Sequence, residues 1–215
     1  STYTLLQGGL LELDQSYYKA SIYDQPHLFT QKLVDLLSGR VGIPFEEPAD
    51  WHLCVAKAMQ TAAEEIAVHF LNHLHDLTQS DNLAVAGGFF MNSVFNGRII
   101  ERTPFKNVFI PFAPTDAGNS IGAALYVHHC IFEQSRTQGR TTSYLGPQFD
   151  DTEIRAALER RSVRYETVEN PAQTAAQHLE QGRIVALFQG AMEFGDRALG
   201  NRSILADPQR AETKD

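Results

Sequence analysis

The sequence predicts an α/β fold, and three observations support this prediction. Short apolar runs at 83–86 and 108–112 each lead through a glycine-containing turn into a helical pattern. Helical and strand-like patterns alternate a second time over residues 151–188. A long amphipathic helical pattern that begins at Asp50 precedes the first alternation.

The N-terminal part predicts a β-hairpin followed by a short helix. Two apolar runs, Tyr3–Leu6 and Leu10–Asp14, flank the dipeptide Gly8-Gly9, which is typical of a hairpin turn. Apolar residues at helical spacing then predict a helix over Leu28–Leu37. The next segment, Arg40–Pro48, contains two prolines and is expected to be a loop.

A long helix is predicted from Asp50 to about residues 79–81. Its apolar residues recur at steps of three and four, so that they form one stripe for burial. They are Val55, Met59, Ala62, Ile66, Phe70, Leu74 and Leu77. We expect the adjacent carboxylates Glu64 and Glu65 to lie on the solvated face.

Two strand–turn–helix units are predicted after the long helix, each with glycine in its turn. The first consists of strand Leu83–Ala86, turn Gly87-Gly88 and helix Asn92–Glu101. The second consists of strand Val108–Phe112, turn Asp116–Gly118 and a helix that runs towards Phe132. Asn119 or Ser120 is suited to cap this last helix, because a short polar side chain can accept a hydrogen bond from a free N–H of the first turn.

A polar linker separates these elements from a second α/β region. The stretch Ser135–Ser143 has almost no apolar residue, which is typical of a linker. Beyond it, helices alternate with strands. The helices are expected over Asp151–Arg161 and Pro171–Gln181, and the strands over Val163–Val168 and Ile184–Phe188. We therefore predict two domains, residues 1–138 and 144–215.

Composition indicates a globular protein and argues against several partners. Hydrophobic residues make up 43% of the chain, as in ordinary soluble domains. The net charge of −8 disfavours non-specific binding to nucleic acid or to anionic membranes, and we expect neither as a partner. Cys54 and Cys130 show no disulfide or metal spacing, which predicts a reducing, cytoplasmic location. The chain opens with Ser1 in a strand-like pattern and stops in the polar residues AETKD, so we expect a piece of a longer protein.

The segment Phe188–Asp207, FQGAMEFGDRALGNRSILAD, is the most informative for function. It combines three glycines with Arg197, Arg202 and Ser203. Glycines let a backbone approach a ligand closely, and arginine binds phosphate or carboxylate through paired hydrogen bonds. The segment therefore predicts the wall of a pocket for a small anion, with a tight turn bearing surface arginines as the alternative. Glu193 is expected either to bind substrate or to orient an arginine.

Two further turns could carry chemistry. Gly87-Gly88 stands where a strand leads into a helix, and free N–H groups at a helix N-terminus favour phosphate. Asn92 could then contact a ribose or base, although a simple strand-to-helix turn would need no ligand. Asp116 could ligate a divalent cation, or could serve as turn-former and helix cap. His69 and His73 have metal-ligand spacing, but polar neighbours favour a solvated edge.

Three segments together resemble the O-carbamoyltransferases of the nodulation-factor and antibiotic-tailoring kind. They are LAVAGGFFMNSVFNGRI, VFIPFAPTDAGNSIGAAL and the FQG segment through ALGNRSILADP. The resemblance covers nearly the whole chain. It implies that residues 1–138 are the second lobe of a nucleotide-binding domain of the actin, Hsp70 and sugar-kinase type. It also implies that residues 144–215 begin a carbamoyl-phosphate-binding domain.

The resemblance implies a two-step reaction. Carbamoyl phosphate and ATP give carbamoyl-adenylate, and the carbamoyl group then passes to a hydroxyl of a small-molecule acceptor, with a divalent metal, iron or magnesium, holding the adenylate. Arg197 and Arg202 would be catalytic. By position, the carbamoyl-phosphate pocket would be lined by Arg197, Arg202, Ser203 and Glu193. The nucleotide would contact Gly87, Gly88, Asn92 and Gly118, and the metal would bind Asp116.

The chain departs from the family pattern in ways that bear on this site. Asp196 stands where proline is common, and Ala191 stands where an arginine often follows FQG. Both changes make the anion pocket less positive. The family's other metal ligands are a histidine pair upstream of this chain, and His69 and His73 do not match it.

Two alternatives stay open. A sugar-kinase-like phosphotransferase would explain the glycine turn and Asp116 but not Arg197–Ser203. A non-catalytic binding module with a degraded pocket would explain Asp196 and Ala191. We expect these 215 residues alone to lack turnover. The acceptor is left open, and so is the oligomeric state, including a homo-oligomer.

Overall fold

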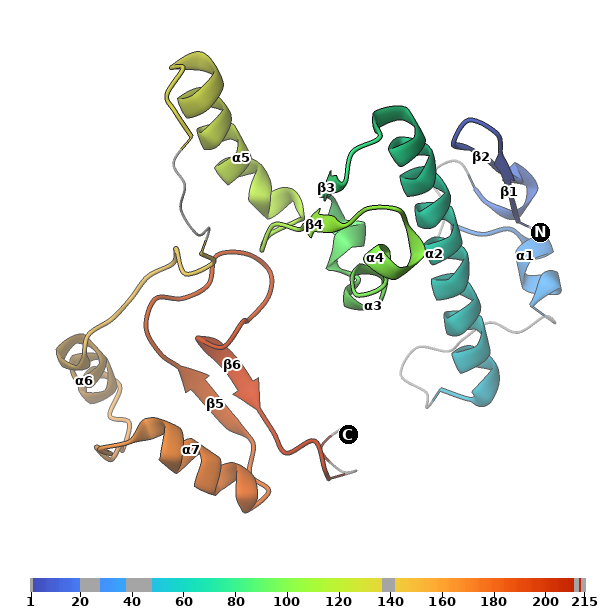
Figure 1. The fold of residues 1–215 in the computed structure, drawn as a ribbon. Helices are drawn as coiled ribbons and strands as arrows, with labels where there is room; N and C mark the ends of the chain where they lie inside the picture. The colour runs from blue at the N-terminus through green and yellow to red at the C-terminus, as the bar shows by residue number, and fades with distance from the viewer. Residues whose placement is uncertain (1, 20–27, 38–47, 137–141, 211–212, 214–215) are drawn as a thin grey trace. The chain divides into compact units, whose positions relative to one another are not determined.

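The computed structural model describes residues 2–19, 28–37, 48–136, 142–210 and 213, and shows a mixed α/β chain in two compact units (Figure 1). Unit 1 comprises Ser1–Val85 and Asn92–Phe109, and unit 2 comprises Ala86–Met91 and Ile110–Asp215. The α/β prediction is confirmed at this level. Most of the predicted loop Arg40–Pro48, and residues 137–141 of the predicted linker, lie outside the described residues, so the division into residues 1–138 and 144–215 stays a prediction.

Unit 1 begins with the predicted hairpin, which packs on a long helix. The hairpin strands are β1 (Tyr3–Leu6) and β2 (Leu10–Leu13), paired antiparallel, and the helices are α1 (Gln31–Leu36) and α2 (Asp50–Thr78). Polar contacts join the hairpin to α2. The Tyr3 hydroxyl donates to Glu65 Oε2 (2.7 Å), and His69 Nε2 lies 3.1 Å from the Leu10 carbonyl oxygen. The His69 edge of α2 therefore supports the hairpin.

The core of unit 1 lies between α2 and a pair of parallel strands. These strands are β3 (Asn82–Ala84) and β4 (Asn107–Phe109), and the chain between them forms α3 (Ser93–Asn96) and α4 (Ile99–Arg102). The single helix predicted over 92–101 is therefore wrong, because the chain breaks at Gly97-Arg98. Three of its side chains, Phe95, Ile99 and Phe105, are at most 2% exposed.

The described residues of unit 2 form three α-helices and a two-stranded antiparallel sheet. They are α5 (Asn119–Tyr126), which continues as a π-helical turn (Val127–Ile131), α6 (Asp151–Arg160), α7 (Pro171–Glu180), β5 (Val185–Phe188) and β6 (Arg202–Leu205). The side chains of Asp150 and Asn170 accept hydrogen bonds from the first turns of α6 and α7, as good N-caps do. These two helices and β5 confirm the sequence prediction.

One predicted strand is wrong and one strand was not predicted. Residues 163–168, all of which the structure describes, form no strand, and Val163, Tyr165 and Val168 are each more than 40% exposed. Alternating apolar residues form a strand only where a neighbour accepts their hydrogen bonds. The partner of β5 is instead β6, which begins at Arg202.

Within the part of the chain that the structure describes, no helix combines the length and the apolar character needed to cross a membrane.

Candidate functional site

Three turns that are far apart in the sequence meet around the segment 112–116 of unit 2. The Gly87 N–H donates to the Pro114 carbonyl oxygen (2.7 Å). The Thr115 hydroxyl donates to Asp196 Oδ2 (2.5 Å), across 81 positions of the sequence. Gly195 lies directly against Ala113. The structure thus brings together parts of all three segments that the sequence singled out for chemistry.

Ala113 is the residue on which two of these turns pack. It is 4% exposed. A Cβ at Gly118 would lie 2.2 Å from the Ala113 carbonyl oxygen, which is too close for any side chain. Gly195 has a φ of +112°, and a Cβ there would lie 3.1 Å from the Ala113 Cβ. Only glycine at both positions allows this approach of backbones.

Asp116 lies at the first position of the turn that leads into α5. The turn Asp116–Gly118 is closed by a hydrogen bond from the Gly118 N–H to the Thr115 carbonyl oxygen (3.0 Å), and Gly118 is the N-cap of α5. Asp116 itself is exposed. Among the described residues, no group of three or more His, Cys, Asp or Glu side chains is arranged to hold a metal ion. Metal binding at Asp116 stays a prediction.

Glu193 organises the segment between β5 and β6, which we call the arginine loop (residues 189–201). Its side chain is fully buried. One carboxylate oxygen accepts the N–H groups of Leu199 (2.6 Å) and Asn201 (2.7 Å), and the other lies 3.6 Å from Arg202 Nε. Burial alone would raise the pKa of Glu193, but these N–H groups and the Arg202 guanidinium outweigh it and hold the pKa below its ordinary value.

The arginine loop is also closed by amide side chains at its base. Asn201 Nδ2 donates to the Ala191 carbonyl oxygen (2.7 Å), and the Gln189 side chain donates to the Gly200 carbonyl oxygen (3.1 Å). Ser203 Oγ accepts the Gly200 N–H (3.1 Å), so its own hydroxyl proton can still be donated. Ala191, which the sequence marked as a departure, contributes only backbone to these contacts.

Arg197 in the loop and Arg202 at the start of β6 are placed differently. The Arg202 side chain is 32% exposed, and its Nη2 donates to the carbonyl oxygens of Gly195 and Arg197, the latter at 3.4 Å. Arg202 therefore helps to hold the loop that carries Arg197. The Arg197 side chain is exposed and available to a ligand. Binding of one anion by both guanidinium groups stays a prediction.

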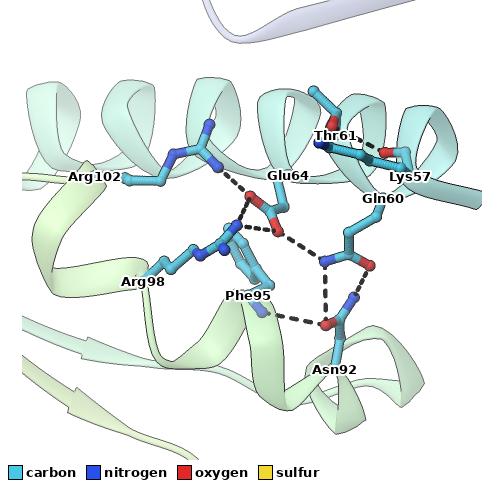
Figure 2. Close-up of polar contacts among 8 residues, drawn as sticks. All are labelled: Lys57, Gln60, Thr61, Glu64, Asn92, Phe95, Arg98 and Arg102. Atoms are coloured by element: carbon cyan, nitrogen blue, oxygen red, sulfur yellow. Dashed lines mark hydrogen bonds and ion pairs between the residues drawn. The ribbon is translucent and has the colours of Figure 1, made fainter. Parts of the chain in front are cut away.

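Asn92, which was predicted to contact a nucleotide, lies in unit 1 and forms internal hydrogen bonds (Figure 2). Its Oδ1 accepts the Phe95 N–H (3.2 Å) and so caps α3. Its Nδ2 donates to Gln60 Oε1 (2.8 Å) on α2. The nucleotide role of Asn92 stays a prediction, and the described contacts give its side chain a structural role.

Glu64 was predicted to lie on the solvated face of the long helix. This prediction is wrong, because only 3% of Glu64 is exposed. Figure 2 shows its carboxylate facing Arg98 and Arg102 across the gap between α2 and the α3–α4 segment. Arg98 Nη1 lies 3.1 Å from both Glu64 oxygens, Arg102 Nη1 donates to Oε2, and Gln60 Nε2 donates at 2.8 Å. The Gln60 hydrogen bond, followed by the two arginines, holds the pKa of Glu64 below its ordinary value. The spacing of Arg98 and Arg102, four residues apart on one helical face, was the available signal.

Comparison with known proteins places both ends of the chain in one family. The family "Carbamoyltransferase N-terminus" matches residues 23–125. The family "Carbamoyltransferase C-terminus" matches residues 176–215. These two matches include Gly87, Asp116 and the whole arginine loop.

Named relatives agree with the family match. Nodulation protein NolO of Bradyrhizobium diazoefficiens is 35% identical over 82% of this chain and 32% of its own length. Nodulation protein NolNO of Sinorhizobium fredii is 33% identical over 82% of this chain and 26% of its own length. The 3'-hydroxymethylcephem-O-carbamoyltransferase of Streptomyces clavuligerus is 27% identical over 65% of this chain and 26% of its own length. The chain thus spans about a third or less of these curated relatives.

Proposed function

This chain belongs to the carbamoyltransferase family, and on that premise we propose that it is part of an ATP-dependent O-carbamoyltransferase. The reaction converts carbamoyl phosphate, ATP and water into carbamoyl-adenylate, with release of phosphate and pyrophosphate. A hydroxyl oxygen of a small-molecule acceptor then bonds to the carbamoyl carbon while the bond from that carbon to AMP breaks. Adenylation supplies the good leaving group that makes the second step feasible.

The observation that carries the proposal is the meeting of three predicted turns around residues 112–116. The Gly87 turn contacts Pro114, and the arginine loop contacts both Ala113 and Thr115. A carbamoyl donor must pass between a phosphate site and a nucleotide site, and such a transfer needs both sites close together. This arrangement fits an enzyme with two substrates better than it fits two unrelated surface turns.

The arginine loop is the proposed site for carbamoyl phosphate. Arg197 is exposed and can bind the phosphate through paired hydrogen bonds, while the Ser203 hydroxyl retains a proton for donation. Arg202 already donates hydrogen bonds to carbonyl oxygens of the loop. It therefore supports the loop and adds a positive charge next to it. Glu193 is buried under the loop, and we assign it to loop support in place of substrate binding.

The nucleotide and metal assignments follow the remaining turns. We place ATP against Gly87, Gly88 and Gly118, which all lie in unit 2. An exposed carboxylate on a tight turn suits a hard cation such as magnesium or iron, and Asp116 has that character. No group of three or more His, Cys, Asp or Glu side chains among the described residues could hold a metal ion, so we propose that further ligands come from elsewhere. A bound divalent ion would supply a positive charge for phosphate oxygens.

We also propose the finer fold and the location that the sequence suggested. The parallel pair β3–β4 with helical turns between its strands is compatible with the second lobe of an actin-like nucleotide-binding domain over residues 1–138. Residues 144–215 would then begin the carbamoyl-phosphate domain. The two cysteines are free, as is usual in a reducing compartment, which favours the cytoplasm.

Product analysis tests the proposed reaction. The full-length protein that contains these residues is incubated with ATP, carbamoyl phosphate and magnesium or ferrous iron, and nucleotide products are resolved by chromatography. We expect carbamoyl-phosphate-dependent release of pyrophosphate and, once a suitable hydroxyl acceptor is added, AMP. Production of ADP with transfer of the terminal phosphate would instead identify a sugar-kinase-like phosphotransferase. Absence of both product sets and of carbamoyl phosphate binding would favour a non-catalytic module.

A further inference from the structure

The contact between Thr115 and Asp196 joins two parts of the proposed site. Asp196 lies on the arginine loop between Gly195, which packs on Ala113, and the exposed Arg197. Thr115 directly precedes Asp116. The hydrogen bond from the Thr115 hydroxyl to Asp196 Oδ2 is 2.5 Å long, as expected when a hydroxyl donates to a charged carboxylate.

Two opposite effects of Asp196 on an anion site follow from elementary electrostatics. Its negative charge next to Arg197 should repel a phosphate and weaken binding. Its hydrogen bond should fix the arginine loop against the Asp116 turn and so reduce the cost of ordering both on binding. Asp196 is exposed, and exposed charges are strongly screened by water, so the repulsion is weak. Water also competes with this exposed side-chain hydrogen bond, but the two segments are already held close by the contact of Gly195 with Ala113.

We propose that Asp196 is a positioning residue, which acts through Thr115 to hold the Asp116 turn in register with the arginine loop. A phosphorylated substrate bound at Arg197 then lies at a fixed place relative to whatever Asp116 binds. This inference rests on the proposed function for its substrate. The contact between the two segments does not depend on that substrate.

A double-mutant cycle tests the pairing, with carbamoyl phosphate as the probe. Thr115→Val and Asp196→Ala each remove the hydrogen bond, whereas Thr115→Ser and Asp196→Asn each preserve a donor or an acceptor. In the full-length protein that contains these residues, we expect the first two variants to raise KM for carbamoyl phosphate by about tenfold, the size expected for a hydrogen bond to a charged group. The double variant T115V/D196A should be no worse than either single variant. The conservative variants should stay within about threefold of wild type, and kcat should change less than KM.

The charge effect gives the contrary outcome. If Asp196→Asn and Asp196→Ala both tighten carbamoyl phosphate binding, Asp196 acts by repulsion and the positioning role is overturned. Additive losses in T115V/D196A would overturn it as well. Glu166→Ala removes an exposed carboxylate of unit 2 outside the site and serves as the matched control, with no expected change.

A ligand-free measurement keeps this inference separate from the proposed function. Amide hydrogen exchange is followed by mass spectrometry in wild type, Asp196→Ala and Glu166→Ala. We expect Asp196→Ala to speed exchange both in residues 195–201 and in residues 116–120, because loosening one segment releases the other. Faster exchange confined to 195–201 would refute the coupling. If the wild type neither binds nor consumes carbamoyl phosphate, the proposed function fails, and this exchange pattern still decides the positioning role.

Discussion

A buried glutamate lies at the centre of a polar network in each unit. These residues are Glu193 in unit 2 and Glu64 in unit 1. Each is at most 3% exposed, and each faces at least one arginine. A buried charge is tolerated only when hydrogen bonds and an opposite charge compensate for lost hydration. The charge of Glu193 is compensated mainly by N–H groups of the arginine loop. This carboxylate therefore fixes the shape of the loop that carries Arg197.

Glu193→Gln tests that role at constant size. The amide places an N–H₂ group where only acceptors are useful, opposite either the loop N–H groups or Arg202. We expect the thermal unfolding midpoint to fall by roughly 5 °C or more. Affinity for carbamoyl phosphate should fall by about tenfold, because the loop loses its fixed shape. Calorimetry and a binding titration measure the two effects. Glu166→Gln is the control, and a midpoint equal to wild type in Glu193→Gln would contradict the assignment.

The lowered pKa values of Glu64 and Glu193 predict how stability depends on pH. In each case the folded protein binds the proton less tightly than the unfolded chain does. Their contribution to stability is therefore present above the unfolded pKa, about 4.3, and is lost as pH falls through the folded value. Thermal midpoints measured from pH 7 down to pH 3 should fall steeply below about pH 4.5. The double variant E64Q/E193Q should show a shallower fall, and equal slopes would contradict the prediction.

At the scale of elements, close packing on Ala113 sets where the arginine loop lies. Gly195 combines a positive φ with a close neighbour, so Gly195→Ala strains the backbone and pushes on Ala113 at once. We expect a loss of about 1–3 kcal/mol in the free energy of unfolding, measured by urea titration. Gly122→Ala is the matched control, because Gly122 lies in α5 with no atom within 4 Å of its Cβ position. That change should stabilise the protein by up to about 1 kcal/mol. A neutral Gly195→Ala would show that the contact is dispensable.

Sequence patterns predicted the elements whose causes are local. The hairpin, α2, α6, α7 and β5 are confirmed, since turn glycines, N-caps and apolar spacing specify them without reference to distant residues. The wrong predictions concern strands, which form only where a neighbouring strand pairs with them. Residues 163–168 have strand-like alternation but no paired neighbour among the described strands, while β6 becomes a strand because β5 lies beside it.

The candidate site follows the same division. The sequence identified the three turns by their glycines and charged residues. The Thr115–Asp196 hydrogen bond and the Gly195–Ala113 contact join positions about 80 residues apart, and spacing alone gives no signal for them. Burial of Glu64 was missed because two adjacent glutamates on an amphipathic helix usually face water. The two arginines that compensate it lie on α4 and just before it, about 35 residues further along the chain.

For the molecule as a whole, the chain contains parts of both family segments within two compact units. Its net charge of −8 opposes binding of anions in general, so affinity for a phosphorylated substrate must come from local donors. Among the described residues of the arginine loop, Arg197 is the exposed cation placed to do this. The account of function therefore depends on one guanidinium held in place by the loop beneath it.

Titration calorimetry of carbamoyl phosphate into the protein tests this claim most directly, with Arg197→Ala and Arg155→Ala compared under identical conditions. Arg155 is an exposed arginine on α6, outside the arginine loop. We predict that Arg197→Ala weakens binding by about tenfold or more, as expected on losing a charge-assisted pair of hydrogen bonds, while Arg155→Ala binds as wild type does. Equal affinities in all three proteins, or no binding by wild type, would contradict the assignment of the arginine loop to carbamoyl phosphate.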